Sequence, residues 1–435
     1  MNNSYDVIIV GTGAAGLYAA LTLPNDYNIL MITKDSLINS DSYLAQGGIS
    51  TLLNENDYDS YFEDTLKAGH YKNDKESVRV MIQKSNQIIE NLIKYGVKFD
   101  LKNGEYDYTR EGGHSANRIL HKNDSTGEEI VTKLIVNAKK RDNINILEYA
   151  TMTDIIQEDN VCYGIYLKYK EESIQPIFAN YVILATGGLG GLFKNSTNFS
   201  HISGDSFAIA IKNNIELENI NYIQIHPTAL YSKKHGRRLL ISESVRGEGA
   251  VLLNEKKERF VNELLPRDVV VEAIFAEMKK YHVDHVYLRL ENMTSEQAKK
   301  RFPKIYEYCL EEGYVLGKDD IPVTPAQHYL MGGIKTNQKG ETSMKHLYAV
   351  GETACNGVHG KNRLASNSLL ESLVFSQEAA NAIVHSDKTR IENDTVIKHQ
   401  LPITDIETTD YNKIVLDEIK RKDIDFYDKW CNDED

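Results

Sequence analysis

Cysteine is scarce in this chain of 435 residues, and its four cysteines form no recognisable pattern. They stand far apart, at Cys162, Cys309, Cys355 and Cys431. This spacing argues against a disulfide framework or a zinc site and favours reduced thiols in the cytoplasm. Long hydrophobic runs are also missing, since no apolar stretch approaches the roughly 18 residues that cross a bilayer. The first residues show no basic segment followed by an apolar one, so we expect neither secretion nor insertion into a membrane.

Positive charge is in deficit, because 50 lysines and arginines stand against 63 aspartates and glutamates. The net charge of −13 argues against nucleic acid and anionic membrane surfaces as partners. It also poses a problem for an acidic substrate, which the protein as a whole should repel. The imbalance is strong after His385, where residues 386–435 hold 14 acidic and 8 basic side chains. We interpret this segment as a short, partly helical C-terminal tail with a weak apolar stripe at Ile414, Val415 and Ile419.

The N-terminal region has the pattern of a strand, a glycine-rich turn, a helix and a second strand. An apolar run at 5–10 precedes Gly-Thr-Gly-Ala-Ala-Gly at 11–16, a helix is expected over 17–23, and residues 29–32 close the βαβ unit. In this GxGxxG pattern the first glycine allows the tight turn, the second lets backbone N–H groups approach a pyrophosphate, and the third allows close helix–strand packing. The pattern favours a dinucleotide over a plain glycine-rich turn but does not separate FAD from NAD. The usual ribose-binding acid is absent from the end of the second strand, because Thr33-Lys34 stands there and Asp35 comes slightly late.

Later segments alternate between helix and strand patterns. Thr126-Gly127-Glu128-Glu129 is a capping-box sequence, and the apolar spacing after it predicts an amphipathic helix. Further strands are expected over 144–149, 161–169 and 178–185. The last runs into Thr186-Gly187-Gly188, which either faces a ligand or simply reverses the chain, and residues 347–352 repeat this form. Two such elements around a long middle section predict an α/β fold whose nucleotide-binding domain is interrupted by an insertion.

Eight stretches resemble the fumarate reductase/succinate dehydrogenase flavoprotein family, in the order that the family has them. They are Ala45-Gln46-Gly47-Gly48-Ile49, Glu111-Gly112-Gly113-His114-Ser115, Ala185-Thr186-Gly187-Gly188, Gln224-Ile225-His226-Pro227-Thr228, Arg246-Gly247-Glu248-Gly249-Ala250, Pro266-Arg267-Asp268, His328-Tyr329 and Asn362-Arg363-Leu364-Ala365-Ser366-Asn367-Ser368-Leu369. The resemblance runs from about residue 4 to residue 385. It implies a Rossmann-like FAD-binding domain interrupted by an α+β capping domain that closes over the substrate. The expected boundaries are 1–219 for the first part of the FAD-binding domain, 220–328 for the capping domain, 329–385 for the second part and 386–435 for the tail.

The resemblance implies FAD in an extended conformation. Its phosphates would lie at residues 12–15, Asp205 and Glu352 would meet its hydroxyls, and residues 368–369 would lie against the flavin. The full set of residues expected to contact FAD is Gly11, Thr12, Gly13, Ala14, Ala15, Gly16, Lys34, Gln46, Gly47, Gly48, Gly187, Gly188, Asp205, Glu352, Ser368 and Leu369.

Two positions separate branches of this family. Asp41 stands where the dicarboxylate enzymes commonly carry a histidine bonded covalently to the flavin, so we predict non-covalent FAD. Glu111 stands where those enzymes usually carry a non-acidic residue, whereas the branch that oxidises L-aspartate carries glutamate. A carboxylate there can pair with the ammonium group that aspartate has and succinate lacks. The alternative for Glu111 is a solvated loop acid.

The resemblance also implies the substrate and catalytic residues. Glu111, His226, Ser242, His328 and Arg363 would bind the substrate, while Arg267, Glu243 and Arg246 would handle protons. A guanidinium with a pKa above about 12 is a poor acid or base, so Arg267 would need the relay through Glu243 and Arg246. The alternative for Arg267 is a structural arginine in a turn that caps the next helix.

The expected reaction is FAD-dependent oxidation of L-aspartate to iminoaspartate, with O₂ or fumarate as electron acceptor. It would be the first step of NAD (quinolinate) biosynthesis, with quinolinate synthase as a functional partner. One alternative is a fumarate reductase or succinate dehydrogenase flavoprotein. Another, of a different class, is a non-catalytic FAD-binding protein, against which the intact set of Arg267, His226, His328 and Arg363 argues.

Overall fold

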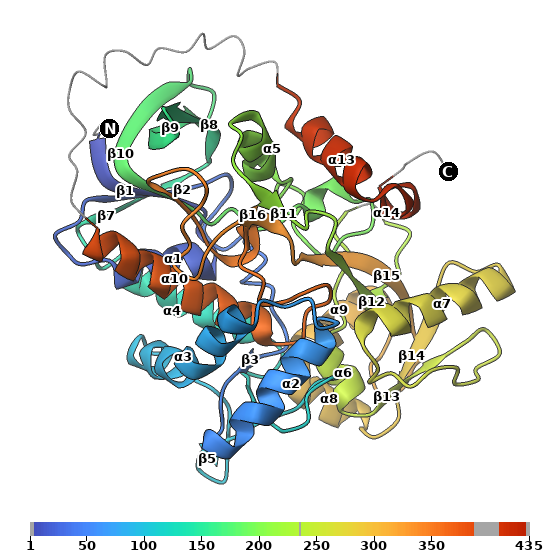
Figure 1. Cartoon of the computed structure of the whole chain (residues 1–435). Coiled ribbons are helices and arrows are strands. Elements are labelled where there is room, and N and C mark those ends of the chain that lie inside the picture. Colours follow the sequence, from blue (N-terminus) through green and yellow to red (C-terminus); the bar gives the residue numbers. More distant parts are fainter. Residues whose placement is uncertain (1–3, 235, 387–408, 432–435) are drawn as a thin grey trace.

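The computed structural model describes residues 4–234, 236–386 and 409–431 of the chain (Figure 1). The largest sheet has seven strands in the order β7-β2-β1-β10-β9-β8, with β17 beside the end of β10. These strands are β1 (Ser4–Val10), β2 (Ile29–Thr33), β7 (Ile144–Glu148), β8 (Ala150–Glu158), β9 (Val161–Tyr169), β10 (Gln175–Leu184) and β17 (Leu347–Ala349). Strands β7, β2, β1, β10 and β17 are parallel, whereas β9 and β8 run antiparallel to their neighbours. The predicted α/β fold and its βαβ unit are confirmed, and β8 is a strand that the sequence did not predict.

Both faces of this sheet are covered, which explains why β1 is apolar along nearly its whole length. Helices α1 (Ala14–Thr22), α3 (Lys75–Lys94), α4 (Thr126–Ala138) and α10 (Asn367–His385) lie on one face (Figure 1). Val7 and Ile9 pack with these helices, while Ile8 and Val10 pack on the other face with Phe207 of α5 (Asp205–Lys212). Helix α2 (Tyr58–Ala68) lies beside α3.

A second, antiparallel sheet has the strand order β12-β15-β14-β13 and a hydrophobic core of its own. Its strands are β12 (Ile223–Leu230), β13 (Ala250–Leu253), β14 (Val286–Leu290) and β15 (Ile321–Leu330), and the helices between them are α6 (Glu243–Gly247), α7 (Arg267–Tyr281), α8 (Ser295–Arg301) and α9 (Pro303–Glu311). Strand β15 runs past the boundary expected at residue 328. The domain boundaries themselves stay a prediction.

Three small sheets complete the framework. They are β3 (Ile49–Ser50) with β6 (Ile119–Leu120), β4 (Leu101–Lys102) with β5 (Glu105–Tyr106), and β16 (Gly333–Lys335) between β11 (Leu217–Glu218) and β18 (Ala354–Cys355). The short pair β3–β6 lies next to the 42–48 loop and to the start of α10, so it connects two segments of the candidate site.

The start of α4 differs from the sequence prediction. Thr126 is the first helical residue, and its hydroxyl donates a hydrogen bond to the carbonyl of Gly47 (2.9 Å) instead of capping the helix. A Cβ atom at Gly127 would lie 2.0 Å from the carbonyl oxygen of Ser42, so only glycine permits this approach. The predicted capping box is therefore wrong, because a tertiary contact takes the hydroxyl. That contact fixes the 42–47 loop against α4.

The C-terminal tail is helical where the structure describes it. Helices α13 (Tyr411–Lys422) and α14 (Ile424–Trp430) follow residue 408, while 387–408 and 432–435 lie outside the described residues. Val415 and Ile419 are fully buried, and α13 lies beside α5 (Figure 1). The ring of Trp430 meets Phe275 of α7 edge to face, with centroids 5.2 Å apart. The tail thus contacts both the large sheet's α5 and the second sheet's α7. Among the described helices, none is long and apolar enough to cross a membrane.

Candidate active site

A single continuous cavity begins at the carboxyl ends of β1, β2 and β10 and extends to the second sheet, reaching β12, α6 and α7. Twenty of the 24 predicted site residues line it. The four that do not are Ala14, Gly16, Gly188 and Arg246. The cavity therefore gathers residues from stretches more than 350 positions apart in the sequence, which is the arrangement expected of a ligand site at the ends of parallel strands.

The glycine-rich turn forms one end of the cavity. Gly11 has φ +114°, and a Cβ atom there would lie 2.0 Å from the carbonyl oxygen of Ala185. Gly16 lies behind the turn, where a Cβ would be 2.1 Å from the carbonyl oxygen of Gly11. Gly13 precedes α1 without a side-chain cap, and an uncapped helix N-terminus offers N–H groups and positive potential to a phosphate. This cradle fits the pyrophosphate of a dinucleotide.

The ribose-binding acid that the sequence lacks is not replaced by Asp35. The carboxylate of Asp35 accepts a hydrogen bond from the backbone N–H of Ser36 (2.7 Å), and Asp35 is not among the residues that line the cavity. Lys34 lines the cavity instead and forms an ion pair with Asp205. Ser203 donates a hydrogen bond to the same carboxylate (2.7 Å). Lys34 and Asp205, both predicted to contact FAD, thus lie together.

Two buried carboxyl groups, Asp41 and Glu352, lie on the cavity wall. Burial raises the pKa of Asp41 to about 7, and burial together with the nearby charge of Asp41 raises the pKa of Glu352 to about 8. Glu352 accepts a hydrogen bond from the N–H of Leu330 (2.8 Å), and Gly188 packs so close that a Cβ there would be 2.3 Å from its Oε1. Gly188 therefore supports Glu352 from behind, which explains why it does not line the cavity itself.

Two histidines and an arginine form the far end of the cavity. The Nδ1 of His226 accepts a hydrogen bond from the N–H of Thr228 (3.1 Å), and its Nε2 has no hydrogen-bond partner among the described residues. A neutral imidazole whose Nδ1 is an acceptor carries its proton on Nε2. The ring of His328 lies 5.1 Å away, and burial together with the charge of Arg267 holds the pKa of both histidines well below the ordinary value. His226 is thus a neutral donor with an unused N–H group.

Arg363 lies close enough to these histidines to lower the pKa of both. Its guanidinium stacks 4.5 Å from the centre of the Tyr329 ring, and Nη1 donates to the hydroxyl of Ser368 (2.9 Å). Its Nε has no partner in the described part of the chain. Burial and the nearby Arg267 lower the pKa of Arg363 to about 10. A bound carboxylate would satisfy this guanidinium, so the cavity attracts anions locally although the protein is acidic overall.

Arg267 begins α7 and lies beside Glu243, the first residue of α6. Its Nε donates to Glu243 Oε2 (2.7 Å) and its Nη1 donates to Gln224 Oε1 (2.7 Å). Behind them, Arg246 Nη2 lies 3.4 Å from the same Oε2 of Glu243. Burial would raise the pKa of Glu243, but the two guanidiniums hold it below the ordinary value. The three residues predicted to relay protons thus form one chain, with Arg246 beneath the cavity wall.

Glu111 shares the cavity with these cations. Its Oε2 accepts a hydrogen bond from the hydroxyl of Ser366 (2.5 Å). Burial, followed by the charge of Glu243, raises its pKa above the ordinary value, whereas Ser366, Arg267 and Arg363 act in the opposite direction. Glu111 is buried rather than solvated, so the alternative of a solvated loop acid does not hold.

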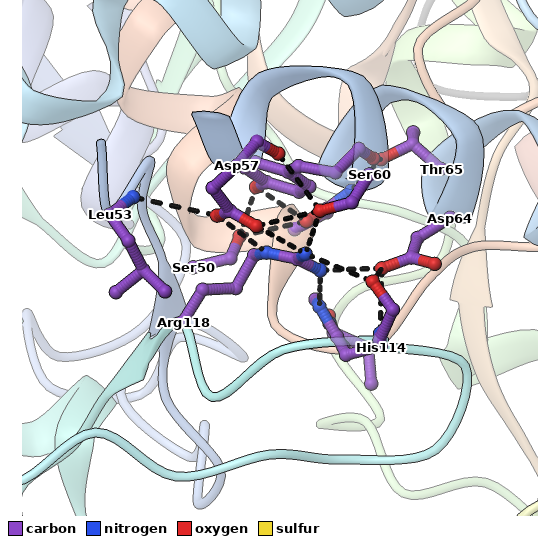
Figure 2. A network of polar contacts seen from close by, with 12 residues as sticks. Ser50, Leu53, Asp57, Ser60, Asp64, Thr65, His114 and Arg118 are labelled. Atoms are coloured by element: carbon purple, nitrogen blue, oxygen red, sulfur yellow. Dashed lines mark hydrogen bonds and ion pairs between the residues drawn. The ribbon is translucent and has the colours of Figure 1, made fainter. Parts of the chain in front are cut away.

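A polar network around Arg118, next to the loop that carries Glu111, was not predicted from the sequence. Figure 2 shows Arg118 between Asp57, Asp64 and His114. Arg118 is fully buried and donates to Asp57 through Nε (3.0 Å) and Nη2 (2.8 Å), to Asp64 through Nη1 (2.6 Å), and to Nδ1 of His114 (3.1 Å). Gln224, which holds Arg267, was also missed. Gln224 and His114 stand within matched stretches, whereas nothing in the sequence around Arg118 indicates its role.

The comparisons with known proteins agree with this geometry. The family described as FAD binding domain matches residues 6–369. The L-aspartate oxidase of Clostridium acetobutylicum is 52% identical over 388 residues, which cover 89% of each chain, and that of Clostridium perfringens is 49% identical over 424 residues, covering 97% of this chain and 95% of the relative. Among solved structures, a mutated FrdA of E. coli quinol fumarate reductase is 26% identical, with a TM-score of 0.86, over 97% of this chain and 81% of that one.

Proposed function

The chain belongs to the FAD-binding flavoprotein family that includes the L-aspartate oxidases, and we propose that it oxidises L-aspartate to iminoaspartate with FAD as cofactor. The electron acceptor is O₂ or fumarate, and the reaction is the first step of NAD (quinolinate) biosynthesis. One observation carries the proposal: Glu111 lies in a buried cavity together with Arg267, Arg363 and two histidines. A dicarboxylate that also carries an ammonium group matches this set of charges.

The substrate roles follow from the contacts. Arg363 and the Nε2–H of His226 have unused donors, so they can hold the two carboxylates of aspartate together with His328 and Ser242. A planar guanidinium binds a carboxylate through two parallel hydrogen bonds. Glu111 can then pair with the ammonium group. Succinate offers no such group, so it would leave the buried carboxylate of Glu111 without the ammonium partner, with only the Ser366 hydroxyl donating to it, at a cost in free energy.

FAD, when bound, supplies the acceptor for the hydride that leaves Cα of aspartate. The chain contributes orientation and proton handling. Arg267 is fixed by Glu243 and Gln224, and its guanidinium can stabilise charge on a substrate carboxylate. As the C=N bond forms, the substrate nitrogen gives up a proton, which the Arg267–Glu243 pair can accept. Charge interactions in this water-poor site are stronger than in bulk water.

Anaerobic reduction of the bound flavin tests the function directly. We expect L-aspartate to bleach the flavin absorbance of the holoenzyme. Succinate should bleach it far more slowly, because succinate has no ammonium group to pair with Glu111. Bleaching by succinate and not by aspartate would favour a fumarate reductase or succinate dehydrogenase flavoprotein, which the likeness to quinol fumarate reductase keeps as the second candidate. A flavin that neither compound bleaches would indicate a non-catalytic FAD-binding protein.

The attachment of the cofactor provides a second test. We expect trichloroacetic acid to release all of the FAD into the supernatant, because an aspartate at position 41 offers no imidazole nitrogen for a covalent bond to the flavin. Absorbance spectra of the supernatant and of the washed pellet measure this. Yellow colour that remains with the pellet contradicts the prediction.

The cellular context is also a proposal. We infer a cytoplasmic enzyme from the four cysteines, which stand far apart in the sequence and show no disulfide pattern. Iminoaspartate would be used by quinolinate synthase, which makes that enzyme a functional partner of this one.

A further inference from the structure

Ser366 uses its hydroxyl in an unusual way. It is the residue immediately before α10, a position where serine normally accepts a hydrogen bond from the first turn of its helix. Here it makes no such cap, and its hydroxyl donates instead to Oε2 of Glu111 at 2.5 Å, across 255 positions of the sequence. Its backbone has φ +62°, in the left-handed region that serine rarely adopts. Ser366 therefore lacks the usual cap hydrogen bond and has a strained backbone conformation. Strained backbone conformations concentrate at functional sites.

The surrounding residues hold Ser366 in this conformation. The N–H of Ser50 donates to the carbonyl of Ser366 (3.1 Å). His114 bonds to the carbonyl of the preceding Ala365 through Nε2 (2.8 Å). Because Arg118 can only donate, Nδ1 of His114 must accept the hydrogen bond between them (Figure 2). The proton of His114 therefore lies on Nε2, which donates to the carbonyl of Ala365. The segment that carries Ser366 is thus bonded to the loop that carries Glu111 at two places, Ala365 to His114 and Ser366 to Glu111.

We propose that Ser366 is a positioning residue for amine selectivity: its hydroxyl fixes the Glu111 carboxylate where the ammonium group of aspartate meets it, and it contributes nothing to a dicarboxylate without that group. This inference rests on the proposed function and adds a specificity determinant to it. The groups that act on the charge of Glu111 include Glu243, Arg246, Arg267, Arg363 and the hydroxyl of Ser366. Ser366 is the one uncharged donor among them, so its replacement removes a contact without altering the charge of the cavity.

The test measures two reactions of the same holoenzyme, aspartate oxidation and fumarate reduction, in Ser366→Ala and Ser366→Gly. We expect kcat/KM for aspartate to fall about 10- to 100-fold in both variants, the range for a hydrogen bond to a charged group, with most of the change in KM. Fumarate reduction should stay within about twofold. The acidic limb of the aspartate pH profile should move to higher pH, because the Ser366 hydrogen bond lowers the pKa of Glu111. The fumarate profile should not move.

Two further variants separate positioning from folding. Glycine adopts a positive φ without strain, so Ser366→Gly removes the hydroxyl while relaxing the backbone. Ser376→Ala removes another buried hydroxyl from α10, one that donates to the carbonyl of Ser372, and it should change neither reaction. In a Glu111→Gln background, Ser366→Ala should have little additional effect on aspartate, because the two substitutions remove the same interaction.

Several results would overturn the inference. Equal losses toward aspartate and fumarate would mean a structural role, and full activity of Ser366→Gly toward aspartate would mean that the hydroxyl is not used. Either result leaves the proposed function intact if the wild type oxidises aspartate. If the wild type reduces fumarate but does not oxidise aspartate, the proposed function fails and the inference fails with it.

Discussion

Replacement of Arg267 by leucine should lower kcat for aspartate by about 10²- to 10⁴-fold, the usual contribution of a positioned proton-transfer group, while FAD stays bound. Arg267 is at the start of α7, where its guanidinium bridges Glu243 and Gln224 at the cavity wall. Leucine fills part of the space but supplies neither charge nor donors. Glu243 would also lose its closest cation, so its pKa should rise and its carboxyl would no longer be ready to exchange a proton.

The measurement combines steady-state kinetics with the flavin content of the purified variant. Arg289→Leu is a matched control, since Arg289 also forms a two-bond ion pair, with Asp320, but lies on β14 outside the cavity lining. It should retain kcat. A near-normal kcat in Arg267→Leu would refute the assignment and support the structural alternative, an arginine that merely caps the helix. Loss of FAD together with activity would likewise refute a specific role in turnover.

Replacement of Arg118 by methionine should lower the free energy of unfolding by about 3–5 kcal/mol, the cost of removing one partner from a buried ion pair. Arg118 is fully buried and is the shared partner of Asp57 and Asp64. Without it, two carboxylates face each other and a histidine in a water-poor site. Urea unfolding of the holoenzyme measures the change. Arg421→Met removes an exposed arginine paired with Glu418 on α13 and should leave the unfolding midpoint nearly unchanged, because exposed ion pairs contribute little.

The pH dependence of this loss has a defined sign. Burial would raise the pKa of Asp57, but the hydrogen bonds and charge of Arg118 hold it below the ordinary value. A carboxylate with a lowered pKa in the folded state stabilises fully above its unfolded pKa of about 3.9, and this contribution disappears as pH falls through the folded value. The wild type therefore loses the contribution in acid, whereas the variant gains from protonation of Asp57. The difference between them should be large near neutral pH and shrink below pH ~4. A constant difference would mean that Arg118 acts through packing alone.

The sequence predicts those features that depend on local pattern. The βαβ unit follows from a short apolar run, three glycines and a second apolar run, all within 35 residues. The charged residues of the cavity, such as Arg267 and Arg363, stand in short stretches that resemble a family. The family resemblance therefore predicted that these residues lie together, and in the structure they line one cavity.

The sequence does not predict features that depend on a distant partner. Ser366 and Glu111 are 255 positions apart, and nothing next to Ser366 distinguishes it from an ordinary helix cap. The prediction of a capping box at Thr126 was wrong for the same reason, because the Thr126 hydroxyl donates its hydrogen bond to the distant carbonyl of Gly47. Strand β8 was missed because it buries Thr153 and Asp154 among its apolar residues. Asp154 accepts hydrogen bonds from Lys212, the last residue of α5, and from Asn213 after it.

The position of Trp430 makes its fluorescence a reporter of movement in α7. Trp430 is the single tryptophan of the chain, and its ring lies edge-on to Phe275, two turns along the helix that begins at Arg267. Indole emission depends on the polarity and packing around the ring. Any displacement of that helix on ligand binding therefore alters the fluorescence of one identified residue, without an added label. Stopped-flow emission can then time the movement of the helix separately from the bleaching of the flavin.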